Sequence, residues 1–234
     1  MNKTFTLSSI ISCLLLGNAA IAQPICEANF EPTSNPDDRF ETQELSTNAG
    51  MIKVINDRAT GLQWAYCPYG QTPSADLASC EGEAQPIGTM RDKNKHQLLE
   101  DTLTQENARL GESAHLWRAP NTHELMSIFN GKCTPAIYHA FSFEINKTDE
   151  EIQAMIDTRV NWWDPKVTEA ERNFADDQRM KGNAYRYLPF TTDTSAKVAS
   201  DGYQTVIFSN AYSVTSTVNT WPGLLRLVRS IPVQ

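Results

Sequence analysis

The 234-residue sequence contains no run of about 18 apolar residues, the length that a helix needs to cross a bilayer. It is also short of basic residues, because 20 Lys and Arg stand against 28 Asp and Glu and give a formal net charge of −8. Such an acidic chain is a poor candidate for binding nucleic acid or polyanionic sugars by bulk charge, and no run of Lys and Arg marks a local basic patch. With 11 Gly, 12 Pro and no internal repeat, the composition favours one globular domain.

Motifs of common catalytic centres are absent. The sequence has no H-E-x-x-H, no G-x-S-x-G, no Walker loop and no G-x-G-x-x-G. The four histidines are His96, His115, His123 and His139. They form no tight cluster with metal-ligand spacing, and His123 beside Glu124 is more typical of a solvated pair than of a catalytic one. We therefore assign no catalytic, cofactor-binding or metal-binding residue and expect no cofactor.

Calcium binding is disfavoured for a related reason. The ion needs several oxygen ligands on one turn, and no acidic stretch has the spacing of a D-x-D-x-D-G loop. The available acidic groups are Asp37-Asp38, Asp149-Glu150-Glu151, Asp176-Asp177, Asp193 and Asp201. Those on expected helices are better interpreted as solvated faces.

The N-terminus is typical of a secretory signal peptide over residues 1–22. Lys3 supplies positive charge, residues 7–16 are mostly apolar, and Ala-Ile-Ala at 20–22 is a small-x-small cleavage site. The alternative is a lipoprotein signal around Cys13, but it would leave three leucines where a polar tether is expected. We therefore expect an exported protein, either periplasmic or secreted to the cell surface.

Four cysteines remain after the signal peptide, an even number that favours two disulfides in an exported chain. Three pairings are possible. The loop between Cys67 and Cys80 is short and rich in turn residues, so we pair these two, and Cys26 then joins Cys133. A zinc site is the alternative, but the spacing lacks a C-x2-C pair.

β-Structure is expected at both ends of the domain. Residues 23–49 are polar and contain three prolines, so we interpret them as an irregular N-terminal arm. A hairpin follows over 51–66, where apolar residues alternate after a turn. Near the C-terminus, strands are expected over 203–209, 212–218 and 224–229.

A corner before the second expected helix organises the middle of the chain. Pro120 ends an extended segment, and Asn121 can cap a helix over 121–130, with Glu124 completing a capping box. The side that this helix buries would comprise Leu125, Ile128 and Phe129. We expect Trp117 to be buried and Arg118 to pair with backbone carbonyls or an acidic neighbour.

Two further segments have helical patterns. Residues 92–110 are good helix formers with leucines near helical spacing. Residues 144–187 form a helical excursion in which Thr148 and Thr168 each open a helix, because a glutamate follows three positions later. Gly182 is expected to end the second of these helices. The first has an apolar stripe of Ile152, Met155, Ile156 and Val160.

The most suggestive contact site lies between these two helices, at Trp162, Trp163 and Asp164. Two adjacent aromatic rings at a helix end cannot both face one core, so one is expected to be exposed and to stack on a sugar or a partner. The alternative is that both rings pack under the excursion. Trp221, in a Trp-Pro-Gly loop, is a weaker candidate of the same kind.

Four motifs together resemble the Lcl C-terminal domain family, which is named for the end domain of a bacterial collagen-like adhesin. Residues 54–64 resemble its opening V-x-D-x-x-T-G-L-x-W, and residues 67–82 resemble a disulfide loop of many members. Residues 117–125 resemble W-R-L-P-T-x-x-E-L, and residues 226–229 resemble the closing V-R-L-V-R strand. The resemblance covers about 51–230, and the excursion matches least.

The resemblance implies an α+β domain over 50–234 with a C-type lectin-like fold. In that fold the first and last strands pair, two helices flank a small twisted antiparallel sheet, and the excursion would be a helical insertion. It also implies export and, in some members, surface attachment or glycan binding. The chain departs from the family because it has no Gly-x-y repeat and lacks the usual aromatic-Ser-Ser strand near 188–192.

The sequence thus predicts an exported, non-enzymatic binding or adhesion module whose partner is a glycan or an envelope protein. One alternative is a structural subunit of a cell-surface assembly. Another is an enzyme of unrecognised type, which would need a pocket with converging polar groups.

Overall fold

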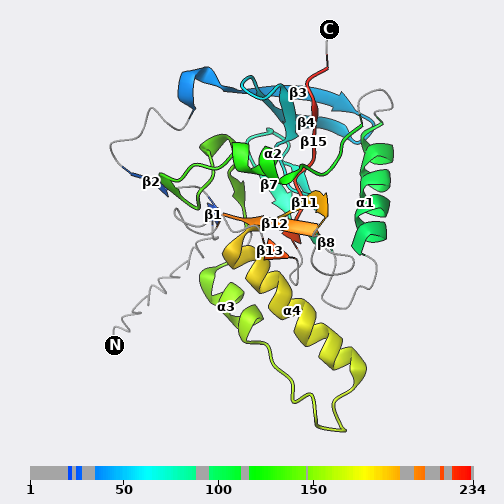
Figure 1. The fold of residues 1–234 in the computed structure, drawn as a ribbon. Helices are drawn as coiled ribbons and strands as arrows, with labels where there is room; N and C mark the ends of the chain where they lie inside the picture. The colour runs from blue at the N-terminus through cyan, green and yellow to red at the C-terminus, as the bar shows by residue number, and fades with distance from the viewer. Residues whose placement is uncertain are drawn as a thin grey trace, which may run out of the picture.

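The computed structural model describes residues 21–22, 25–27, 35–87, 95–111, 116–145, 147–195, 203–208, 217–218 and 223–232. In this part of the chain the fold is mixed α+β, with antiparallel sheets and four α-helices (Figure 1). No helix among these residues is long and apolar enough to cross a membrane. Most of the predicted signal peptide lies outside the described residues.

A four-stranded antiparallel sheet has the order β15-β5-β4-β3. Its strands are β3 (Phe40–Thr47), β4 (Gly50–Asp57), β5 (Leu62–Ala65) and β15 (Val228–Ser230). The β4–β5 pair confirms the hairpin predicted over 51–66. The pairing of first and last strands that the resemblance implied is not found, because β4 already has β3 and β5 as neighbours and β15 pairs with β5.

The irregular arm predicted for residues 23–49 is wrong for Phe40–Thr47, which pairs with β4 along its whole length. β3 is an edge strand, and most of its side chains are exposed or half-exposed. Because most of these side chains face solvent, the strand can consist largely of Glu, Thr and Gln without alternating apolar residues. A tight turn at residues 48–49 leads into Gly50, whose φ of 102° suits a residue without a side chain.

The second large sheet has five strands in the order β13-β12-β11-β14-β8. They are β8 (Pro86–Ile87), β11 (Pro189–Ser195), β12 (Tyr203–Ile207), β13 (Thr217–Val218) and β14 (Gly223–Leu224). All neighbours are antiparallel except β11 and β14. The strand predicted over 203–209 is thus confirmed over Tyr203–Ile207, and residues 209–216 lie outside the described part.

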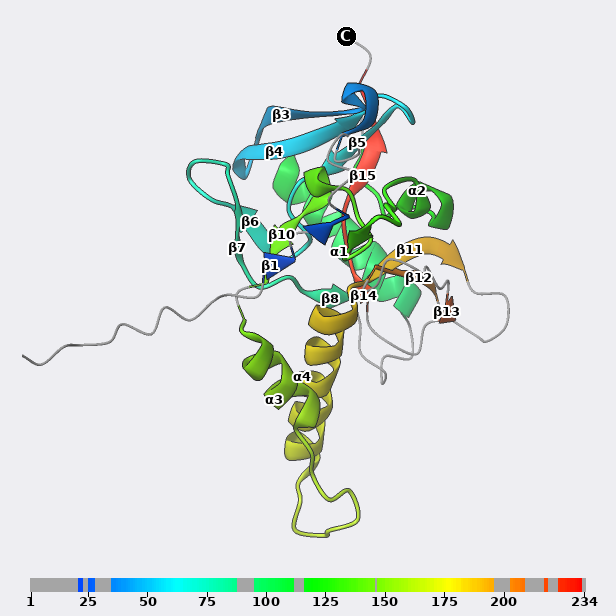
Figure 2. The same ribbon diagram turned by 90° about the vertical axis from the view of Figure 1, so that its left-hand side faces the viewer.

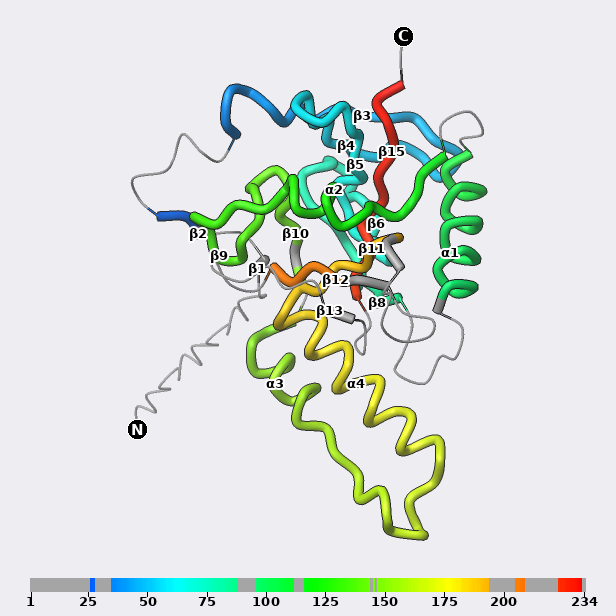
Figure 3. Tube along the Cα trace, viewed as in Figure 1, coloured from blue at the N-terminus to red at the C-terminus, as the bar shows by residue number. Residues whose placement is uncertain are grey.

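The closing segment differs from the single strand predicted over 224–229. β14 belongs to the five-stranded sheet and β15 to the four-stranded one, so the last segment connects the two sheets (Figure 3). Arg226 lies between them, fully buried, and donates hydrogen bonds to the carbonyls of Ala65, Tyr66 and Phe141. Burial lowers the pKa of Arg226 to about 9. Three carbonyl acceptors hold this guanidinium where the two sheets meet.

The helices are α1 (Lys95–Leu110), α2 (Thr122–Ser127), α3 (Asp149–Asp157) and α4 (Glu169–Tyr187), with short 3-10 turns η2 (Pro36–Asp38) and η3 (His139–Phe141). Three two-stranded ladders complete the described elements. They pair β1 (Ile21–Ala22) with β10 (Phe143–Glu144), β2 (Ile25–Cys26) with β9 (Cys133–Thr134), and β6 (Gln71–Pro73) with β7 (Cys80–Gly82). Both predicted disulfides are formed, Cys26–Cys133 and Cys67–Cys80.

The corner before α2 is bonded to three elements of the body, α1, α2 and β15. Trp117 is 1% exposed, and the Asn107 side chain of α1 bonds both its backbone N–H and its carbonyl at 2.8 Å. Arg118 exchanges two backbone hydrogen bonds with Val228 of β15, both 2.9 Å, and its guanidinium is paired with Glu124. The capping box of Asn121 and Glu124 is present. The predictions of a buried Trp117, a paired Arg118 and the capping box are therefore confirmed, whereas the helix predicted over 121–130 is shorter and ends at Ser127.

The turn between β4 and β5 is fixed by a buried ion pair. Asp57 is fully buried and accepts hydrogen bonds from Arg39 at 2.6 and 2.5 Å and from the N–H of Ala59. Burial would raise the pKa of Asp57, but its hydrogen bonds with Arg39 and Thr60 and the Arg39 charge outweigh that effect and lower it. The opening motif of the family resemblance thus has a structural role at this turn.

Candidate functional site

The α3–α4 hairpin projects from the body and ends in a loop at its far end (Figures 1 and 2). α4 has 19 residues and is therefore about 28 Å long at 1.5 Å per residue. Only the base of the hairpin enters the main core, through Ile152, Ala184, Tyr185 and Leu188. The loop at residues 158–168 is consequently held well away from the sheets.

The two helices of the hairpin pack closely against each other. Gly182 does not end α4 as predicted, because the helix continues to Tyr187. A Cβ atom on Gly182 would lie 2.9 Å from Cγ1 of Ile156 and 3.0 Å from Cβ of Met155. Glycine is therefore needed here for the close approach of α3. The predicted capping boxes at Thr148 and Thr168 are both present.

The predicted contact residues Trp162, Trp163 and Asp164 lie together in the loop at the far end of the hairpin. Trp163 is 93% exposed and Trp162 is 44% exposed, so the two rings do not both pack under the excursion. The guanidinium of Arg172 lies 5.9 Å from the Trp162 ring. Asp164 is half-buried, and its carboxylate accepts a hydrogen bond from the N–H of Lys166 at 2.9 Å. Trp221, the fourth candidate, lies outside the described residues.

We use the name tip loop for residues 158–168. It carries the cations Arg159 and Lys166 and one carboxylate, Asp164. Both cations are exposed. The tip loop is thus aromatic and slightly basic on a chain whose formal net charge is −8. The sequence contained all these residues, but their common position depends on the hairpin.

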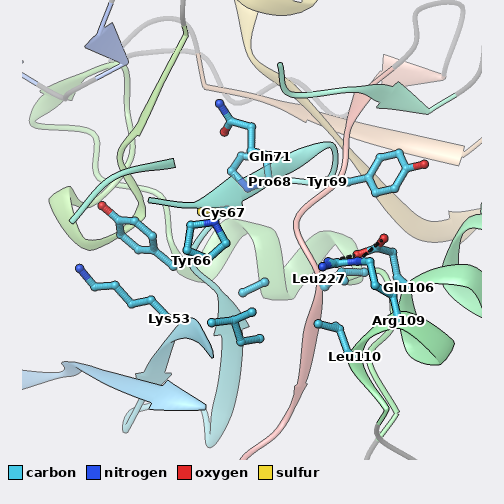
Figure 4. Close-up of a pocket in the computed structure, with 13 residues that line it drawn as sticks. Lys53, Tyr66, Cys67, Pro68, Tyr69, Gln71, Glu106, Arg109, Leu110 and Leu227 are labelled. Carbon is cyan, nitrogen blue, oxygen red and sulfur yellow. Dashed lines mark hydrogen bonds and ion pairs between the residues drawn. The ribbon is translucent and has the colours of Figure 1, made fainter. Parts of the chain in front are cut away.

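A pocket on the body lies between α1, the hairpin β4–β5 and the disulfide loop (Figure 4). The Lys53 ammonium lies 4.3 Å from the centre of the Tyr66 ring, and Glu106 is paired with Arg109. The pocket has a volume of about 30 Å³. Pockets that hold small molecules usually have volumes of about 300 Å³ or more, so this one has room for little more than water.

Metal chemistry finds no support in the part of the chain that the structure describes. No three His, Cys, Asp or Glu side chains there are grouped so that they could hold an ion. His139 lies 3.3 Å from Sγ of Cys26, which belongs to a disulfide. His123 and Glu124 are neighbours on α2, but Glu124 is bound to Arg118 and to the N–H of Asn121. The carboxylate of Glu124 thus has a structural role.

Comparisons of the chain with family models, with curated proteins and with solved structures found no match in any of the three. The resemblance to the Lcl C-terminal domain family therefore stays a prediction from the four motifs. The tip loop is the candidate site, because its tryptophans are exposed to solvent, whereas the tryptophans of the four resemblance motifs are buried in the body.

Proposed function

We propose that this protein is an exported, non-enzymatic binding module that attaches to the cell envelope through the tip loop of the α3–α4 hairpin. The observation that carries the proposal is the 93% exposure of Trp163 at the far end of a projecting hairpin. Trp side chains are highly buried on average, and they are enriched among the residues that dominate the energy of binding interfaces. An exposed Trp held away from the body is therefore suited to contact a partner.

The rigidity of the hairpin supports the same function. Arg186 of α4 donates a 2.7 Å hydrogen bond to Gln153 of α3, and the guanidinium of Arg172 bonds the carbonyl of Asp164 at 3.2 Å. The first bond and the close packing at Gly182 hold the two helices together, and the second ties the tip loop to α4. A preorganised contact loses less conformational entropy on binding than a flexible one does. The tip loop can therefore present its rings without first becoming ordered.

Export is part of the proposal and rests on two observations. The N-terminal residues have the pattern of a signal peptide, and both disulfides are of the kind that persists in oxidising compartments. The family resemblance suggests a C-type lectin-like fold and a partner that is a glycan or an envelope protein. The α+β class is the one that the resemblance implies, but the first and last strands do not pair as that fold requires.

The test is binding to envelope material. Purified protein at micromolar concentration is sedimented with envelope fragments and with isolated cell-wall polymer, and it is also applied to a glycan array. We expect the wild type to bind at least one of these materials and a Trp162→Ala/Trp163→Ala variant to lose most of that binding. Leu116→Ala is the matched control, since Leu116 is 58% exposed on the body. Equal binding by wild type and double variant would refute the proposal.

A further inference from the structure

The backbone donors at the centre of the tip loop are used within the loop itself. The Oδ1 atom of Asn161 accepts a hydrogen bond from the backbone N–H of Trp163 at 3.1 Å. The backbone carbonyl of Asn161 accepts a second one from the N–H of Asp164 at 3.1 Å. The carboxylate of Asp164 accepts a hydrogen bond from the N–H of Lys166 at 2.9 Å, and the backbone carbonyl of Asp164 accepts one from the N–H of Val167 at 3.1 Å. The residue between these two turns is a proline, which has no N–H. Residues 163–167 therefore offer no free backbone donor.

This arrangement bears on the chemistry of the surface that the tip loop contacts. A loop that recognises a sugar or a peptide by hydrogen bonding usually keeps polar backbone groups available for it. A loop whose donors are already bonded can enter a medium poor in hydrogen-bond partners at a low cost in free energy. Residues 163–167 of the tip loop, which include Trp163, have this second property.

The side chains of the loop are also arranged for a soft surface. Trp163 is 93% exposed and so is not enclosed by the protein as a residue of a small-ligand pocket would be, and the adjacent Trp162 is 44% exposed. Val160 and Val167 are half-exposed on either side. A Trp ring has an apolar body and a polar N–H, which is why Trp is enriched where membrane and water meet.

The charged groups fit the same environment. Arg159 and Lys166 are exposed and make no ion pair with the described residues. Both side chains have long apolar stems that can lie along hydrocarbon while the charged group reaches phosphate. The carboxylate of Asp164 is engaged in its own turn. Glu171, in the first turn of α4, is held in the capping box with Thr168.

We propose that the tip loop binds at the boundary between the headgroups and the acyl chains of a phospholipid bilayer. Trp163 enters first, Trp162 follows, and Arg159 and Lys166 lie at the level of the lipid phosphates. The hairpin then holds the body of the protein away from the membrane. This assignment rests on the proposed attachment through the tip loop and identifies the envelope component as lipid, not glycan or protein.

The experiment uses the full exported chain and vesicles of phosphatidylethanolamine and phosphatidylglycerol in equal parts. Cosedimentation gives the binding constant. We expect Trp163→Ala to weaken vesicle binding by at least about tenfold and Leu116→Ala to leave it unchanged. Because ring insertion is the main contribution, raised salt should weaken binding only about threefold or less. Equal binding by Trp163→Ala and wild type, or complete loss of binding at raised salt, would overturn the proposal.

A second variant tests the backbone argument separately from the rings. Asn161→Ala keeps both Trp side chains and removes the acceptor of the Trp163 N–H. We expect vesicle binding about threefold weaker or more, because the freed donor must be desolvated. The circular dichroism spectrum and the unfolding midpoint should match those of the wild type. Wild-type affinity in this variant would contradict the inference.

Parallel sedimentation with envelope fragments separates this inference from the proposed function. Loss of envelope binding in Trp163→Ala, without any wild-type binding to vesicles, would overturn the lipid assignment and leave the proposed attachment standing. If the wild type binds neither vesicles nor envelope fragments, both proposals are wrong. Binding to both, each dependent on Trp163, is the result that the lipid assignment predicts.

Discussion

Two Trp-containing corners of this protein have opposite environments. Trp117 precedes α2 on the body and is 1% exposed, whereas Trp163 precedes α4 in the hairpin and is 93% exposed. Each is followed within three residues by a proline. Trp117 is fixed by Asn107 of α1, and Trp163 by Asn161 of its own loop. The comparison shows that a corner bonded to other elements organises the fold, whereas one that bonds to itself remains available for contact.

The largest effect is expected at the buried corner. Trp117→Ala should lower the free energy of unfolding by about 3–5 kcal/mol, because it removes a fully buried ring and leaves a cavity. Denaturant unfolding followed by circular dichroism measures the change. Tyr187→Ala, which removes an aromatic ring that is 43% exposed, is the control and should cost far less. Wild-type stability in Trp117→Ala would show that this corner does not organise the fold.

A smaller and local effect is expected where the hairpin is packed. Gly182→Ala should destabilise the hairpin by about 1–3 kcal/mol, because the added methyl group would overlap Ile156 and Met155. Amide hydrogen exchange should become faster in α3 and α4 and stay unchanged in β4 and β5. Asn173→Ala, an exposed site on the same helix, is the control. Uniformly faster exchange across the whole protein would mean that the hairpin and the body are one cooperative unit.

Lowering the pH should destabilise the body of the protein through protonation of Asp57. Its folded-state pKa lies below its unfolded value, so the native state binds fewer protons. The stabilisation is therefore complete above the unfolded pKa of about 3.9 and is lost as the pH falls through the lowered pKa. Unfolding measured across this pH range should show a smaller acid dependence in Asp57→Asn than in the wild type. An identical pH profile would argue against the Arg39–Asp57 pair as its source.

The smallest effect on stability is expected at the tip. Trp163→Ala should change the free energy of unfolding by no more than about 0.5 kcal/mol, because the ring is 93% exposed. The same denaturant experiment that is used for Trp117→Ala measures it. A loss of about 2 kcal/mol or more would place Trp163 among the residues that organise the fold.

Local signals in the sequence predicted local structure. The capping boxes at Asn121, Thr148 and Thr168 are each complete within four residues, and all three are present. The Cys26–Cys133 disulfide, which spans 107 residues, followed only because these two cysteines were left after the other pair was assigned. The hairpin over 51–66 and the Cys67–Cys80 disulfide followed from short-range patterns. Such features need little information from distant parts of the chain.

Features that depend on distant contacts were not predicted. β3 lacks apolar alternation because it is an edge strand, and only its pairing with β4 reveals it. The final segment divides at Arg226, whose carbonyl partners lie in the β5 region and in η3. Gly182 was interpreted as a helix stop, since a glycine that ends a helix and one that permits close packing look alike in sequence. The sequence also left open whether Trp162 and Trp163 are exposed, because their position depends on how the hairpin packs.

Envelope binding by the Trp162→Ala/Trp163→Ala variant tests the central claim most directly. We expect this variant to have the unfolding midpoint and circular dichroism spectrum of the wild type and to lose most of its sedimentation with envelope fragments. That result would show that the tip loop is needed for binding but not for folding. Undiminished binding by a correctly folded double variant would contradict the claim that the tip loop is the contact site.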